Sequence, residues 1–97
     1  MLQSSIKNHT TLLLFGAGEF SQLIRTYLPE SYAKVTALVV ESLLGSRTFD
    51  KPIIEFRKIN ASNQQIIVGV NPASQEIVKI KLIEAGFKKS DILMLDV

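Results

Sequence analysis

Residues 12–30 read LLLFGAGEFSQLIRTYLPE. An apolar run leads directly into Gly16-Ala17-Gly18, and an amphipathic pattern follows at once. A first glycine permits a tight strand–helix turn, and a second lets the phosphates of a ligand approach the backbone. Free amides at the start of the helix then point at the ligand, together with the positive end of the helix dipole. The stretch therefore predicts a strand, a dinucleotide-binding type of turn and a helix.

Two residues depart from the usual G-x-G-x-x-G pattern. Ser21 stands where the third glycine is expected, a position that serves helix–strand packing and also accepts alanine. Glu19 puts a carboxylate in the first helical turn, where it would repel a phosphate. A bound phosphate therefore requires Glu19 to turn aside, or to meet a hydroxyl or amine of the ligand. The alternative is a tight turn that holds no ligand.

Apolar runs and turn residues predict the other elements. Pro29 ends the first helix, Asn71 and Pro72 form an N-cap and first position, and Gly86 follows the second helix. We expect strands at residues 11–15, 35–40, 52–56, 65–70 and 92–95, helices at 20–28 and 73–85, and a loop at 43–51.

This alternation predicts a single α/β domain at residues 11–97 behind a polar tail at residues 1–10. Right-handed crossovers give a Rossmann-like parallel sheet of about five strands in the order 3-2-1-4-5, with flanking helices. The connection between the second and third strands is short for a helix. We therefore expect one face of the sheet to be thinly covered, which makes that face a candidate surface for a homodimer or a partner domain.

In this strand order a crevice opens between the carboxyl ends of the first and fourth strands. The turn from Gly16 through Ala17, Gly18 and Glu19 to Phe20 forms one wall, and residues 70–73 form the other. Asn71 carries both a donor and an acceptor for a base edge or a sugar. Its other role is to cap the second helix.

Glu41 follows the second strand at about the separation from the glycines where NAD sites place a carboxylate for the ribose hydroxyls. A solvated strand end is the other interpretation of this glutamate.

Composition excludes several classes of protein. The 97 residues carry a net charge of +2, with no basic stripe of the kind that nucleic-acid binders show. The sequence has no cysteine and a single histidine, His9, so thiolate metal sites and disulfides are absent and a catalytic triad is poorly supported. The absence of cysteine fits a cytoplasmic location. No apolar stretch approaches the about 20 residues of a membrane span.

The succession FGAGEF, VTALVVES, TFDKPIIEF and IIVGVNPASQEIVKIKLIEAGF resembles the N-terminal nucleotide-sugar-binding domain of bacterial sugar O-acyltransferases of the sialic acid O-acetyltransferase type. Related domains occur in other glycan-modifying enzymes. The resemblance covers roughly residues 11–88. It implies that uridine diphosphate lies at Gly16, Ala17, Gly18 and Glu19, near the strand end at Glu41 and beside Asn71.

The sequence departs from that family in two respects. A run of aspartates is typical after the second strand, whereas this chain has Val40-Glu41-Ser42. The hexapeptide repeats and catalytic histidine of the acyltransferases are missing, so the resemblance does not extend to acyl transfer.

Three hypotheses follow. The first is a non-catalytic domain that binds a nucleotide or UDP-sugar in surface-glycan biosynthesis. The second is an assembly domain without a ligand, whose apolar face forms a dimer. The third is an NAD-sensing regulatory domain, which only Glu41 supports.

Overall fold

The computed structural model describes residues 11–41, 50–61 and 64–94. Five parallel strands form one sheet in the order β3-β2-β1-β4-β5, which confirms the predicted topology. The strands are β1 (Thr11–Phe15), β2 (Val35–Val40), β3 (Ile53–Glu55), β4 (Gln64–Val68) and β5 (Ile92–Leu93). The helices are α2 (Glu19–Tyr27), α3 (Pro29–Ala33) and α4 (Pro72–Glu84), and short 3-10 turns lie at η1 (Phe56–Lys58) and η2 (Lys89–Asp91).

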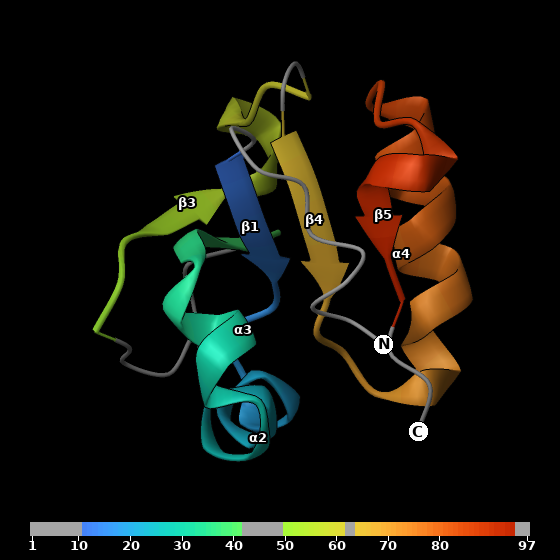
Figure 1. Ribbon diagram of the computed structural model, residues 1–97. Helices are drawn as coiled ribbons and strands as arrows, with labels where there is room; N and C mark the ends of the chain where they lie inside the picture. The colour runs from blue at the N-terminus through green and yellow to red at the C-terminus, as the bar shows by residue number, and fades with distance from the viewer. Residues whose placement is uncertain (1–10, 42–49, 62–63, 95–97) are drawn as a thin grey trace.

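The sheet separates two apolar layers, as a parallel sheet with both faces covered requires. Alternate residues of β1 divide between them: Leu12 and Leu14 join the layer that includes Ile24 of α2 and Tyr32 of α3. Leu13 and Phe15 join the layer that includes Val78 and Leu82 of α4. Figure 1 accordingly shows α2 and α3 on one side of the sheet and α4 on the other.

The helix ends follow the predicted caps, with one addition. Pro29 ends α2 and is also the first residue of α3, a short helix that the sequence analysis missed. Proline suits this position because an N–H in the first helical turn would have no acceptor within the helix, so its absence costs nothing. Asn71 and Pro72 begin α4 as predicted, and Gly86 follows it with φ +108°.

The apolar stripes predicted for the two long helices are only partly buried. Ile24 of α2 is 3% exposed, but Leu23 and Tyr27 are 44% and 75% exposed. On α4, Val78 and Leu82 are buried, whereas three isoleucines, Ile77, Ile80 and Ile83, are exposed. Periodicity identified the helices correctly, but both carry more apolar surface than the sheet covers.

Strand lengths differ from the prediction at three points. The third strand is confined to Ile53–Glu55, because Phe56 already begins η1. The fourth ends at Val68 rather than at residue 70, where the chain bends. The fifth is Ile92–Leu93, with residue 95 outside the described residues. Also outside the described residues lie the predicted tail at 1–10 and most of the predicted loop at 43–51. The expectation that one face of the sheet is thinly covered depends on that loop.

Candidate functional site

Three chain segments meet at the carboxyl edge of the sheet, where β1, β2 and β4 end. The amide of Gly16 donates to the carbonyl of Val39 at 2.7 Å, and the amide of Gly69 donates to the carbonyl of Phe15 at 2.9 Å. The glycine turn therefore lies between the ends of β2 and β4, at the point where the strand order reverses. In Figure 1 the arrowheads of β1 and β4 point to the same end of the molecule, where α2 and the start of α4 lie.

Gly16 is required by the fold. Its φ of +114° lies in a region that L side chains rarely adopt. A Cβ atom there would also lie 2.7 Å from the carbonyl oxygen of Gly69. The first glycine of the turn thus allows β1 to turn sharply while remaining in contact with the end of β4.

Gly18 is not required by the fold. Its φ of −115° and ψ of −155° are extended values that any residue adopts. A Cβ atom at Gly18 would meet no heavy atom of the described residues within 4 Å, and the residue is exposed. The glycine leaves the start of α2 uncovered without any packing reason for doing so.

The amides at the start of α2 have no capping side chain. The first helical hydrogen bond runs from the Gln22 amide to the Gly18 carbonyl at 3.2 Å, so the amides of residues 19–21 have no acceptor within the helix. Gly18, at the N-cap, has no side chain to accept from them. Such a helix start attracts anions through its free N–H groups and its partial positive charge.

Ser21 joins the turn to the end of β4. The side chain is fully buried, and its hydroxyl lies 3.0 Å from the carbonyl oxygen of Gly16 and 3.1 Å from that of Gly69, so that it can donate to either. Gly69 makes room for it, because a Cβ at Gly69 would lie 2.9 Å from the Ser21 Oγ and 2.7 Å from Leu14 Cδ1. The serine in place of the third glycine is therefore matched by a glycine directly after β4, which the sequence pattern did not indicate.

Asn71 performs the capping role that was one of its two predicted roles. Its Oδ1 accepts a hydrogen bond from the Ser74 amide at 3.1 Å at the start of α4. The exposed side chain lies two residues after Gly69, on the β4 side of the turn. Because the cap uses the oxygen, a ligand contact by Asn71 would fall to its amide nitrogen.

Glu41 is paired with a cation that the sequence analysis did not consider. Its carboxylate forms an ion pair with the ammonium of Lys81, which lies in α4. Both side chains are partly exposed. Glu41 directly follows Val40, the last residue of β2, so the pair lies just beyond the carboxyl end of that strand.

The remaining predicted site residues lie in the turn itself. Ala17 is buried and packs in the apolar layer under α2 and α3. Glu19 and Phe20 form the first turn of α2, and their side chains lie outside the described part of the structure. The turn, Glu41 and Asn71 thus converge on one edge of the sheet.

A second polar cluster lies at the opposite edge, where β2 begins. Tyr32 donates to Asp50 Oδ1 at 2.7 Å, and the Lys51 ammonium lies 4.6 Å from the centre of the Tyr32 ring while donating to the Val35 carbonyl at 2.6 Å. Burial, reinforced by Asp50, raises the pKa of the Tyr32 phenol to about 12. The same hydrogen bond lowers the pKa of Asp50. These contacts attach the segment before β3 to α3.

Comparison with known proteins adds no relative. No family model, curated protein or solved structure matches this chain. Within residues 11–41, 50–61 and 64–94, no three histidine, cysteine, aspartate or glutamate side chains group as metal ligands. Over the same residues, no helix has the length and apolar character needed to cross a membrane.

Proposed function

We propose that this chain is a nucleotide- or UDP-sugar-binding domain without catalysis of its own. The observation that carries the proposal is Gly18, which the fold does not require and which leaves the amides of residues 19–21 without a capping side chain. A phosphate bound there would accept hydrogen bonds from these amides and interact with the positive end of the α2 dipole. The base or ribose would extend toward Asn71 or Glu41.

The sequence resemblance supports uridine diphosphate as the ligand. Domains of the sialic acid O-acetyltransferase type carry the same order of strand, glycine turn and helix, and they hold that part of a nucleotide sugar. On this basis we propose a role in surface-glycan biosynthesis, as a cytoplasmic domain of a sugar-modifying system. NAD is the alternative ligand, and it would use Glu41 for its ribose.

Thermal unfolding in the presence of ligands tests the proposal. At a concentration 100 times its Kd, a ligand stabilises the folded state by about 2.7 kcal/mol, which raises the melting temperature of a domain this small by about 10 °C or more. We expect this shift with UDP or a UDP-sugar and a smaller one with NAD. No shift with any nucleotide would contradict the proposal.

Substitution of Gly18 locates the ligand. Gly18→Val adds a branched side chain where the described residues leave space, so the fold should persist while UDP binding is lost. Ala85→Val is the matched control, since Ala85 is exposed and is the C-cap of a different helix, α4. If Gly18→Val keeps full UDP affinity, the ligand does not bind at the glycine turn.

Glu19 provides a second test at the same turn. Glu19→Gln removes a negative charge from the first turn of α2, so affinity for a diphosphate should rise or stay the same. A marked fall would mean that the carboxylate itself contacts the ligand.

One observation favours an assembly function as the second candidate. Ile77 and Ile80 on α4 are 63% and 52% exposed, which is unusual for isoleucines on a helix that also packs on a sheet. A second copy of the chain packed along α4 would cover them. Sedimentation of the wild type and of Ile80→Lys tests this candidate: a dimer that the substitution dissociates supports it, and a monomeric wild type excludes it.

A further inference from the structure

The outward face of α4 carries the side-chain pattern of a helix that packs against another helix, and we infer that two copies of this chain associate through parallel α4 helices. Ile77 and Ile80 are 63% and 52% exposed. Ala73 and Glu84, which are also exposed, continue the same line toward the two ends of the helix. The inference rests on the assembly candidate and not on nucleotide binding, and it adds the orientation of the two copies and the charges that set it.

These four residues form a single stripe along α4. The separations between them are four, three and four residues, which is the spacing of the side chains that line the contact between two packed helices. Val78 and Leu82, which pack α4 against the sheet, are buried and lie on the other side of the helix. A second helix can therefore lie along the stripe without disturbing the packing of α4 on its own sheet.

Opposite charges flank the stripe on its two sides. At 100° per residue, Glu76 and Lys81 each lie about 70° from the line midway between Ile77 and Ile80. In a parallel pair of helices, a residue on one flank faces the residue five positions later on the opposite flank of the second helix. Glu76 of each copy therefore meets Lys81 of the other, and two-fold symmetry forms this ion pair twice. The Lys81 ammonium has three donors, so it can keep Glu41 as a partner.

An antiparallel pair lacks these ion pairs. In that arrangement each flank faces the same flank of the second copy, which sets Glu76 opposite Ile83 and Lys81 opposite Ser74. The complementarity of charge therefore favours the parallel pair.

Glu84 opposes the parallel pair at one end only. Its side chain would face Glu84 of the second copy, whereas an antiparallel pair would set it opposite Ala73. Glu84 is the last residue of α4, so the helices can diverge there and separate the two carboxylates. The isoleucines and the ion pairs lie nearer the middle of the helix, where the copies are closest.

The contact is small, so we expect weak association. About two helical turns on each copy bury less than the about 1,200 Å² at the lower limit of stable interfaces. The dimer should therefore form only as the protein concentration rises toward the millimolar range.

Disulfide cross-linking measures the orientation directly, because the chain has no cysteine of its own. Parallel helices place the two Ala73 positions side by side, so Ala73→Cys should cross-link to itself on mild oxidation. Antiparallel helices would separate these positions by about 16 Å and would cross-link Ala73→Cys to Glu84→Cys instead.

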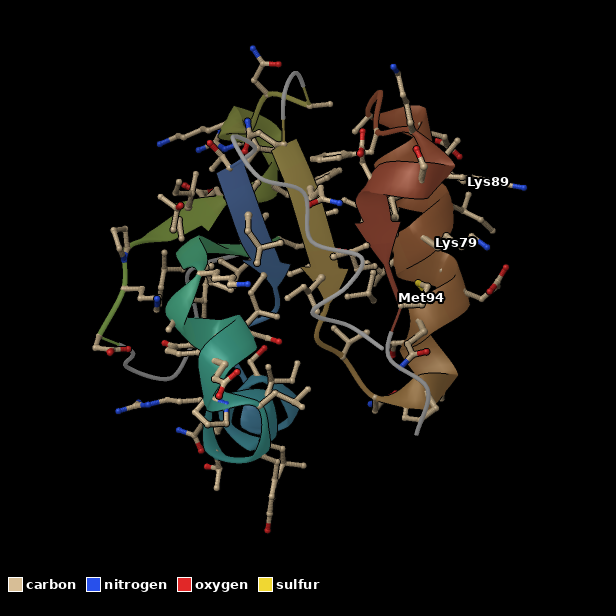
Figure 2. All side chains as sticks on the ribbon, in the orientation of Figure 1. Lys79, Lys89 and Met94 are labelled. Atoms are coloured by element: carbon tan, nitrogen blue, oxygen red, sulfur yellow. The ribbon has the colours of Figure 1, made fainter. Side chains whose placement is uncertain are left out.

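Lys79→Cys is the control for cross-linking by chance collision. Figure 2 shows Lys79 on the same side of α4 as Lys89 of η2. Lys79 lies about 130° around the helix from the middle of the stripe. We expect Lys79→Cys to form far less cross-linked dimer than Ala73→Cys.

Two glutamine variants test the charges, since Glu76→Gln and Glu84→Gln make the same change in net charge on the same helix. We expect Glu76→Gln to weaken dimerisation about fivefold, because two symmetric ion pairs are lost. Glu84→Gln should strengthen it by about twofold, because it removes the repulsion at the end of the stripe. Sedimentation over a concentration series measures both, and the effects should shrink in about 0.5 M salt.

The outcomes that overturn the inference are distinguishable. If Ala73→Cys cross-links to Glu84→Cys and not to itself, or if the two glutamine variants dimerise equally, the parallel orientation is wrong while the assembly candidate stands. If the wild type stays monomeric at millimolar concentration and Ala73→Cys forms no cross-link, the assembly candidate and the inference fail together, and the nucleotide proposal is unaffected. Circular dichroism of each variant confirms that it is folded.

Discussion

The fold places different requirements on three glycines near the start of α2, namely Gly16, Gly18 and Gly69. Gly16 adopts a positive φ, Gly69 leaves space for Leu14 and Ser21, and Gly18 does neither. Substitutions at these residues therefore separate requirements of the fold from a requirement of a ligand.

We predict that alanine at Gly16 or Gly69 destabilises the protein by about 1–3 kcal/mol, because each Cβ would approach another atom to 2.7 Å. Gly18→Ser should instead stabilise it by a few tenths of a kcal/mol, since serine is the better N-cap. The same serine should weaken UDP binding, because its hydroxyl accepts from an amide that the phosphate needs. Urea unfolding and calorimetry measure the two effects. If Gly18→Ser lowers stability as much as Gly16→Ala does, the fold requires this glycine after all.

Tyr32 provides a prediction for the pH dependence of stability. Its pKa rises from 10.0 in the unfolded chain to about 12 in the folded protein, so the folded state resists loss of the proton. The stabilisation is fully present below pH 10 and is lost between pH 10 and 12, where only the unfolded chain ionises.

Replacing the phenol with a benzene ring isolates this effect. Tyr32→Phe should be less stable at neutral pH, because it loses the hydrogen bond to Asp50, and its stability should fall less steeply through the same alkaline window. Urea unfolding at a series of pH values compares the two proteins. Parallel curves for Tyr32→Phe and the wild type would contradict the role of the phenol.

Among the elements, α4 packs against the sheet through only part of its surface. Leu82 is fully buried against the sheet, whereas Ile80 is 52% exposed. We predict that Leu82→Ala lowers the free energy of unfolding by about 2–5 kcal/mol and that Ile80→Ala lowers it by less than about 1 kcal/mol. Urea unfolding at low protein concentration measures both. Comparable losses would mean that Ile80 is buried in solution, as the assembly candidate requires.

The sequence predicted where the helices and strands lie better than which side of each helix is buried. Caps such as Asn71-Pro72 are local, and they located the start of α4 correctly. The burial of one side of a helix depends on what packs against it, so apolar spacing could not show that Leu23 is exposed while Ser21 is buried. The helix α3 was missed because Pro29 both ends one helix and begins the next.

At the scale of the whole molecule, the strand order was predictable because right-handed crossovers leave few topologies for this alternation of strands and helices. The contacts that shape the site were not predictable from the sequence. The Ser21–Gly69 and Lys81–Glu41 contacts join residues 48 and 40 positions apart, and no local pattern relates them. Only the folded sheet shows that a serine at the third position of the turn is matched by Gly69, the residue after β4.

The proposed function depends on phosphate binding by the backbone amides at the start of α2. Titration of UDP into 15N-labelled protein, followed by amide chemical shifts, tests it most directly. We predict that the largest and saturable shifts occur at residues 18–21, with smaller shifts at Glu41 and Asn71, and that Gly18→Val abolishes them. If UDP leaves the amides of residues 18–21 unchanged, or shifts mainly residues at the opposite edge of the sheet near Tyr32, phosphate does not bind at the start of α2.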